Sequence, residues 1–275
     1  MVDRKILFGL TLILGSMTEG HRMSASQPGP GVELIVFAAA SLADAFQAIG
    51  SDFESANQEI RIAYNFAGSQ QLLQQIVNGA SVDVFAPASW KQIDAAVASG
   101  QIDSSSVRIF ARNRLVIIVP KKNEAGLKSL HDLARPNLKI VLADKAVPVG
   151  QYSLEFLDKC SAGGSAEKQF KEDMLRNVVS YEENVRAVLS KVVMGEADAG
   201  IVYASDISRD STHRVDRIDI PDSLNVIANY HISIVKGAKH RDSGRRFVDY
   251  ILSKKGQATL IQFGFLPAEA DSARR

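Results

Sequence analysis

The alternation of apolar runs with helical segments constrains the fold of this chain more than any other feature. Short apolar runs typical of strands are followed by longer segments in which apolar residues recur at helical spacing. This order predicts an α/β fold with mostly parallel sheets flanked by helices. The predicted strands are 33–38, 61–66, 82–86, 114–119, 139–143, 178–181, 199–203, 224–228 and 231–235. The predicted helices are 41–55, 69–78, 91–98, 151–159, 166–174, 184–194 and 243–252.

Two apolar strands suggest how the chain is divided. The strands at 115–119 and 232–235 are expected to carry the chain into a second lobe and back, as a two-strand hinge. Lobe 1 is then discontinuous, with residues 32–113 and 236–275, and lobe 2 comprises residues 114–235 including the hinge strands. One larger doubly wound sheet is the alternative that the sequence leaves open. Residues 208–223, polar and charged, are interpreted as a surface connection.

Residues 1–25 have the order of a secretory signal. Arg4 and Lys5 precede an apolar run at 6–15, and small residues follow at 24–26. The apolar run is shorter than the ~20 residues that a membrane-spanning helix needs. We therefore expect a cleaved signal and a periplasmic protein, with a buried N-terminal helix as the alternative.

Composition and missing motifs exclude several classes of function. The chain has 32 Lys and Arg against 31 Asp and Glu, and this near-neutral balance argues against a nucleic-acid partner. The single cysteine, Cys160, can form neither an internal disulfide nor a multi-cysteine zinc site. The five histidines lack metal-binding spacing, and the glycine motifs of nucleotide sites are absent, so no cofactor is expected.

Four strand ends share one design that suits an anion. At 37–46, 65–73, 147–152 and 181–188 an apolar strand ends in a tight turn and a helix begins at once. Ser41 and Ser69 occupy the expected N-cap positions of two of these helices. Helix N-termini present unpaired N–H groups and a positive dipole end, which favour an anion. None of the turns places Lys or Arg at the expected contact position, so the predicted site binds through neutral donors.

Five segments together resemble the periplasmic molybdate-binding proteins of ABC transporters. They are residues 36–42 (VFAAASL), 66–72 (FAGSQQL), 83–88 (DVFAPA), 147–152 (VPVGQY) and 200–206 (GIVYASD). The resemblance covers about residues 33–267 and implies a two-lobed periplasmic binding protein fold that closes on its ligand. It also implies the donors: hydroxyl and amide from Ser41 and Ser69, backbone amides from Val149 and Val185, and the phenol of Tyr203. Gly68 departs from the pattern, because relatives often carry Ser there.

The same resemblance implies a transport function rather than catalysis. The expected protein is a monomer that binds molybdate, or tungstate, and delivers it to a membrane permease and its ATPase. Molybdenum would be held only as the bound oxyanion, by the same five residues, with no cofactor and no catalytic residue. Two alternatives come from other classes: a serine-dependent hydrolase with Ser41 or Ser69 as nucleophile, and an anion-sensing effector domain. The absence of a G-x-S-x-G motif argues against the first, and the signal segment against the second.

Overall fold

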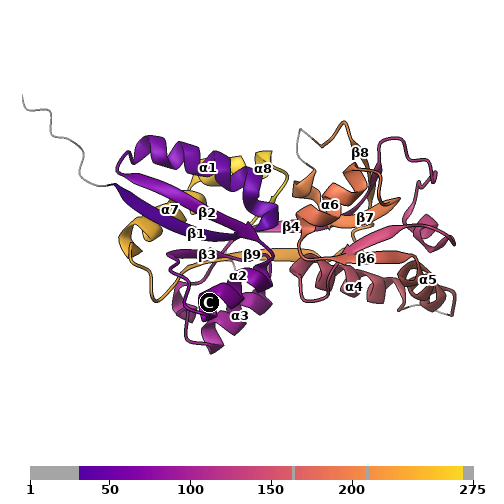
Figure 1. Ribbon diagram of the computed structural model, residues 1–275, viewed down its shortest axis with the longest axis horizontal. Helices are drawn as coiled ribbons and strands as arrows, with labels where there is room; N and C mark the ends of the chain where they lie inside the picture. The colour runs from indigo at the N-terminus through magenta and orange to yellow at the C-terminus, as the bar shows by residue number, and fades with distance from the viewer. Residues whose placement is uncertain (1–30, 163–164, 208–210, 269–275) are drawn as a thin grey trace, which may run out of the picture.

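The computed structural model describes residues 31–162, 165–207 and 211–268, which form two lobes joined by two long strands (Figure 1). The expected signal at 1–25 lies outside the described residues. Within the described ranges, no helix combines the length and the apolar character needed to cross a membrane. The predicted two-lobed α/β architecture is confirmed, and each lobe has its own parallel strands covered by helices.

Lobe 1 is built around a parallel strand near the start of the fold. The strand β1 (Val32–Ala39) lies between β2 (Ile60–Ala67) and β3 (Val84–Ala86), and all three run parallel. In α1, Phe46, Ile49 and Phe53 recur at helical spacing and are buried against this sheet and the neighbouring helix. The helices of the lobe are α1 (Ala43–Ala56), α2 (Ser69–Val77), α3 (Trp90–Ala98), α7 (Arg241–Leu252) and α8 (Lys254–Gln262).

Lobe 2 repeats this arrangement. The strand β5 (Ile140–Ala143) lies between β6 (Val178–Glu182) and β7 (Ala199–Tyr203), again in parallel. All residues of β5 and β7 are buried, as expected where helices cover both faces of a parallel sheet. The helices are α4 (Pro148–Cys160), α5 (Ser165–Arg176) and α6 (Val185–Val193).

The two lobes are connected by an antiparallel pair of long strands. In β4 (Arg108–Pro120) and β9 (Ile227–Ile234), residues 108–114 pair with residues 227–232. Beyond this ribbon, β4 pairs with β7 inside lobe 2 and β9 pairs with β3 inside lobe 1. The expected hinge residues 115–119 therefore pair within lobe 2, and Ser233 and Ile234 pair within lobe 1. The division into 32–113 with 236–275, and 114–235, stays a prediction.

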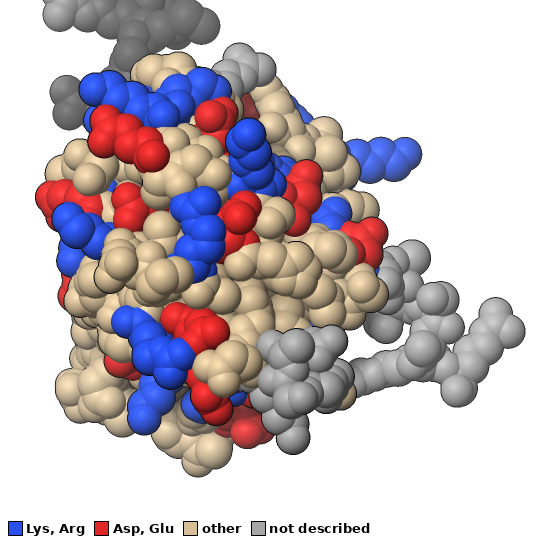
Figure 2. Space-filling view, turned by 90° about the vertical axis from the view of Figure 1, so that its right-hand side faces the viewer, with Lys and Arg blue, Asp and Glu red and all other residues tan. Residues whose placement is uncertain are grey.

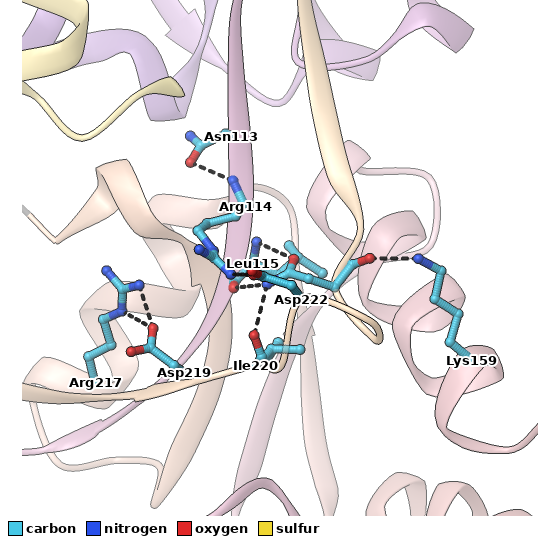
Figure 3. Close-up of polar contacts among 9 residues, drawn as sticks. Asn113, Arg114, Leu115, Lys159, Arg217, Asp219, Ile220 and Asp222 are labelled. Carbon is cyan, nitrogen blue, oxygen red and sulfur yellow. Dashed lines mark hydrogen bonds and ion pairs between the residues drawn. The ribbon is translucent and has the colours of Figure 1, made fainter. Parts of the chain in front are cut away.

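The side chain of Asn225 hydrogen-bonds the hinge strand β4 where this strand enters lobe 2. The Leu115 N–H donates to Asn225 Oδ1 at 3.0 Å, and Asn225 Nδ2 donates to the Leu115 carbonyl at 2.9 Å (Figure 3). Lys159 Nζ donates to the Asn225 carbonyl at 2.6 Å, and Arg114 forms an ion pair with Asp222. The side-chain amide of Asn225 thus hydrogen-bonds both backbone groups of Leu115, as a neighbouring strand would. These bonds attach the segment before β9 to the hinge strand β4.

Four elements differ from the sequence prediction. Residues 208–223 were expected to be a surface connection, but they contain β8 (Val215–Asp219), which pairs with β4. The strands expected at 224–228 and 231–235 are the single strand β9, because extended pairing continues through the polar residue Asn229. The helix α8 and the short β10 (Leu266–Pro267), which pairs with β4 at the hinge, were not predicted.

Charged side chains are interspersed on the end face of lobe 2. Figure 2 shows Lys and Arg mixed with Asp and Glu over this face rather than gathered into a patch of one sign. In the same lobe, Lys121 lies 2.5 Å from Asp216 and Lys191 lies 2.7 Å from Glu182. Such neighbouring opposite charges leave little net field over the surface that this view displays.

Candidate functional site

The five residues expected to hold the ligand line one pocket between the lobes. Ser41 and Ser69 come from lobe 1, and Val149, Val185 and Tyr203 come from lobe 2. The complete lining is Ala39, Ala40, Ser41, Ala67, Gly68, Ser69, Ala88, Val147, Pro148, Val149, Asn184, Val185 and Tyr203. The pocket leaves a cavity of about 10 Å³, roughly the space in which one water-sized sphere fits. Sites for organic ligands typically measure ~300–1,000 Å³, so this pocket suits a small ion.

A wider hollow elsewhere contains none of these residues. It lies in lobe 2 between the turn after β4 and the end of α6, where Lys122, Met194 and Arg214 contribute to its wall. The strand ends and helix N-termini that the sequence singled out are all at the smaller pocket. The smaller pocket is therefore the candidate site.

The two serines lie at strand ends but do not cap helices. Ser41 is in a single 3-10 turn, η1 (Ala40–Leu42), and Ser69 is the first residue of α2. The expectation that both are N-caps was wrong, because Leu42 and Gly68 occupy those positions. The Gly68 N–H donates instead to Gln71 Oε1 at 3.1 Å. Gln71 provides this bond at α2 and α1 has no side-chain capping bond, so neither serine hydroxyl is used at a helix N-terminus.

Each serine hydroxyl is buried and oriented by a protein group. Ser41 Oγ lies 2.8 Å from Tyr230 Oη, and Ser69 Oγ accepts a hydrogen bond from the Ala88 N–H at 3.1 Å. A serine hydroxyl that accepts from the protein keeps its own hydrogen to donate. Either hydroxyl of the Ser41–Tyr230 pair can be the donor, and when Tyr230 donates, both serines offer a hydrogen to the pocket. Neither Tyr230 nor Ala88 was anticipated in this role, although Ala88 lies within a segment that the resemblance included.

Lobe 2 contributes the first turns of two helices. Val149 is the second residue of α4, after Pro148, and Val185 is the first residue of α6. Amides at these positions have no intrahelical acceptor. A Cβ on Gly150 would lie 2.1 Å from the Asp144 carbonyl oxygen, which shows how tightly the start of α4 packs on the end of β5. Only glycine permits this approach, and it fixes the position of the Val149 amide.

Tyr203 brings a phenol to the pocket from the end of β7. Its side chain is 1% exposed, and its hydroxyl has no hydrogen-bond partner among the described atoms. Burial, reinforced by neighbouring Tyr230 and Tyr152, raises the pKa of Tyr203 well above its usual value. The phenol therefore stays protonated and can only donate to an anion. The Tyr203 N–H donates to Asp206 Oδ2 at 2.9 Å, which fixes the end of the strand.

The pocket itself contains no charged side chain and no histidine among its lining residues. A serine nucleophile requires a base, most often histidine, within hydrogen-bond distance. Here the nearest polar partners of the serines are a tyrosine and a backbone amide. In the part of the chain that the structure describes, no group of three or more His, Cys, Asp or Glu could hold a metal ion. The arrangement can hold an anion with neutral donors, and it offers no nucleophile and base pair.

Cys160 lies apart from this pocket. It is the last residue of α4 and is half-buried as a free thiol. Burial raises the pKa of the thiol to about 11, so it is protonated at neutral pH. The structure therefore gives Cys160 no part in the candidate site.

Comparison with known proteins places this architecture in a family. The family model described as bacterial extracellular solute-binding protein matches residues 34–266. The molybdate-binding protein ModA of Mycobacterium tuberculosis is 34% identical over 263 residues, which cover 94% of this chain and 95% of that protein.

Two solved structures share the fold at lower sequence identity. The sulfate-binding protein SubI of Mycobacterium tuberculosis aligns with a TM-score of 0.78 and 17% identity, covering 86% of this chain and 88% of that one. The periplasmic molybdate-binding protein of Azotobacter vinelandii aligns with a TM-score of 0.75 and 17% identity, covering 86% of this chain and all of that one. Because these two proteins are named for different oxyanions, the shared fold does not decide the ligand.

Proposed function

Because the chain belongs to the bacterial extracellular solute-binding proteins, we propose that it binds molybdate and delivers it to the permease of an ABC transporter. The observation that carries this proposal is the pocket between the lobes, whose lining holds five candidate donors and no charged side chain. The identity of 34% with a molybdate-binding protein over nearly the whole chain supports the choice of ligand. Tungstate, with the same charge and shape, is proposed as the second ligand.

Neutral donors explain how such a site would discriminate. Sulfate carries the same charge but is smaller, so it cannot reach donors on both lobes at once. Phosphate at neutral pH carries a proton that needs an acceptor, and a buried donor left unpaired costs ~1–3 kcal/mol. The one side-chain carbonyl in the lining, Asn184 Oδ1, already accepts from the Ala187 N–H at 3.0 Å. We therefore expect both competitors to bind weakly.

The division of donors between lobes supports closure on binding. Two serines lie on one side of the hinge ribbon, and two amides and a phenol lie on the other. An anion that touches both sets has a higher affinity for the closed form, which is what shifts a hinge equilibrium. The closed form would then present a permease and its ATPase with a shape that distinguishes loaded from empty protein. We propose that this takes place in the periplasm, after removal of the signal at 1–25, and that the protein acts as a monomer.

Calorimetric titration with molybdate, tungstate, sulfate and phosphate tests the proposal. Molybdate and tungstate should saturate one site per chain, while sulfate and phosphate should give much weaker binding or no heat. Equal affinity for sulfate and molybdate would contradict the molybdate assignment. X-ray scattering of the same samples should show a smaller radius of gyration with saturating molybdate, and size-exclusion chromatography should give the mass of one chain.

A further inference from the structure

One ion pair crosses from lobe to lobe beside the candidate site. Arg186 is the second residue of α6, next to Val185, and its Nη2 lies 2.9 Å from Asp44 Oδ2. Asp44 is the second residue of α1, in the lobe that carries the serines. The Arg186 and Asp44 side chains are 27% and 33% exposed, so the pair is partly shielded from solvent. Both residues are in the first turns of helices that begin at the pocket.

Arg186 also has a partner within its own lobe. Its Nε lies 3.6 Å from Asp206 Oδ1, and the Asp206 side chain is fully buried. The other carboxylate oxygen accepts from the Tyr203 N–H at 2.9 Å, so the position of Asp206 is fixed by β7. Since neither contact involves lobe 1, Asp206 can hold the guanidinium in place whether the lobes are open or closed. In this structure Arg186 therefore lies between Asp206, which is fixed in its own lobe, and Asp44 of lobe 1.

The charges explain why this arginine is not itself a ligand for the anion. Arg186 faces two carboxylates and does not line the pocket, whose walls are neutral. A second bridge between the lobes is also polar: Gln70 Nε2 donates to the Glu183 carbonyl at 3.0 Å, and Gln71 Nε2 donates to Glu183 Oε2 at 3.0 Å. Of these two bridges, only the one through Arg186 joins full opposite charges.

We propose that Arg186 is a positioning residue that couples anion binding to closure of the lobes. Asp206 holds it in lobe 2, and it pairs with Asp44 only when the lobes are closed, so the pair slows release of the bound anion. The bound anion and the ion pair both favour the closed state. Each therefore increases the fraction of closed protein, and so favours formation of the other. This inference rests on the proposed function, because it requires a ligand that the closed form retains.

The test uses Asp44→Asn as its main variant. This substitution removes the partner in lobe 1 but leaves Arg186 beside Asp206, so no buried charge loses its counter-charge. The matched control is Asp52→Asn on the same helix, where Asp52 Oδ2 lies 3.0 Å from Lys255 Nζ within lobe 1. Molybdate affinity is measured by calorimetry at low and high salt, and molybdate release by stopped-flow competition. Arg186→Gln and the double variant Asp44→Asn with Arg186→Gln complete the set.

We expect Asp44→Asn to weaken molybdate binding by about 3- to 30-fold, mainly through faster release, since a partly buried pair lies between the exposed and buried extremes. The salt dependence of affinity should be smaller in this variant than in the wild type. Asp44→Asn should have no further effect when Arg186→Gln is already present. Asp52→Asn should behave like the wild type, because its ion pair lies within one lobe.

The inference is overturned if Asp44→Asn releases molybdate at the same rate as Asp52→Asn. It is also overturned if Asp44→Asn weakens binding equally with and without Arg186, since the effect would then not pass through the ion pair. A wild-type protein that binds none of the four oxyanions contradicts the proposed function, and the inference falls with it. A wild-type protein that binds molybdate while Asp44→Asn is unaffected contradicts the inference alone.

Discussion

The two sides of the candidate pocket use different kinds of donor. Lobe 1 offers the hydroxyls of Ser41 and Ser69, which are hydrogen-bonded to the Tyr230 hydroxyl and to the Ala88 N–H, respectively. Lobe 2 offers backbone amides at the starts of α4 and α6, together with the phenol of Tyr203. A side-chain donor is lost by a single substitution, whereas a backbone donor is lost only when the chain itself is displaced. The two lobes should therefore respond differently to mutation.

The largest expected effect comes from moving the backbone of lobe 2. In Gly150→Ala, the new Cβ would lie 2.1 Å and 2.4 Å from the carbonyl oxygens of Asp144 and Ala143. Overpacking of this kind should destabilise the fold by ~1–3 kcal/mol and, by shifting the Val149 amide, weaken molybdate binding by more than ~100-fold. Calorimetry measures the binding and urea unfolding the stability. The control is Gly237→Ala, where a Cβ has nothing within 4 Å. Wild-type affinity in Gly150→Ala would show that the start of α4 is not part of the site.

Substitutions at the donors themselves test the comparison directly. Ser41→Ala and Ser69→Ala each remove a hydrogen bond to a charged ligand, worth ~1.5–3 kcal/mol, so the dissociation constant should rise ~10- to 150-fold. Val149→Ala and Val185→Ala keep their amides and should change the affinity little. The four variants are compared by molybdate titration under one set of conditions. The contrast between lobes fails if the valine and serine variants lose equal affinity.

Tyr203 should give two effects of opposite sign. Its buried hydroxyl has no hydrogen-bond partner among the described atoms, and an unpaired buried polar group costs ~1–3 kcal/mol. Tyr203→Phe should therefore raise the free energy of unfolding of the ligand-free protein while weakening molybdate binding by ~10-fold. Thermal unfolding with and without molybdate measures both. If Tyr203→Phe destabilises the ligand-free protein, its hydroxyl serves the fold rather than a ligand.

The smallest net effect concerns pH, where a buried group of lobe 2 and a buried group of the hinge strand β9 oppose each other. Burial raises the pKa of Asp206 in lobe 2 from 3.8 to about 6 and lowers the pKa of His231, on β9, from 6.5 to about 4. Between those values the folded protein holds the proton on Asp206 more tightly than the unfolded chain does, so acidification from about pH 6 to 4 stabilises the fold. At His231 the unfolded chain binds the proton more tightly than the folded protein does. Acidification from about pH 6.5 to 4 therefore destabilises the fold.

Each pKa shift changes the free energy of unfolding by roughly 3 kcal/mol over its pH range. The two contributions have opposite signs and should largely cancel in the wild type. Asp206→Asn should therefore lose stability on acidification more steeply than the wild type, and His231→Gln should lose it less steeply or gain it. Urea unfolding at several pH values between 4.5 and 7.5 measures these slopes. If stability changes with pH equally in the wild type, Asp206→Asn and His231→Gln, then Asp206 and His231 do not make the opposing contributions assigned to them.

Much of this site follows from local sequence, because its donors lie where a strand ends and a helix begins. The apolar runs and small-residue turns located the strand ends, the family resemblance implied the individual donors, and the structure brings Ser41, Ser69, Val149, Val185 and Tyr203 into one pocket. The N-cap role expected for the serines was wrong because capping depends on one or two local dihedral angles that composition does not fix. β8 was missed because Asp216, Arg217 and Asp219 make it mostly charged, and only its pairing with β4 makes it a strand.

The sequence by itself determined the α/β class, the parallel strands and the residue types that can donate to an anion, since these depend on short-range periodicity and chain geometry. Only the tertiary structure decided which groups orient those donors. Tyr230 contacts Ser41 across 189 positions of sequence, and Arg186 contacts Asp44 across the two lobes. Such pairs leave no local pattern, because each residue is an ordinary tyrosine, arginine or aspartate until the hinge ribbon brings distant strand ends together. The donors are therefore encoded locally, whereas their orientation and the link between the lobes arise from packing.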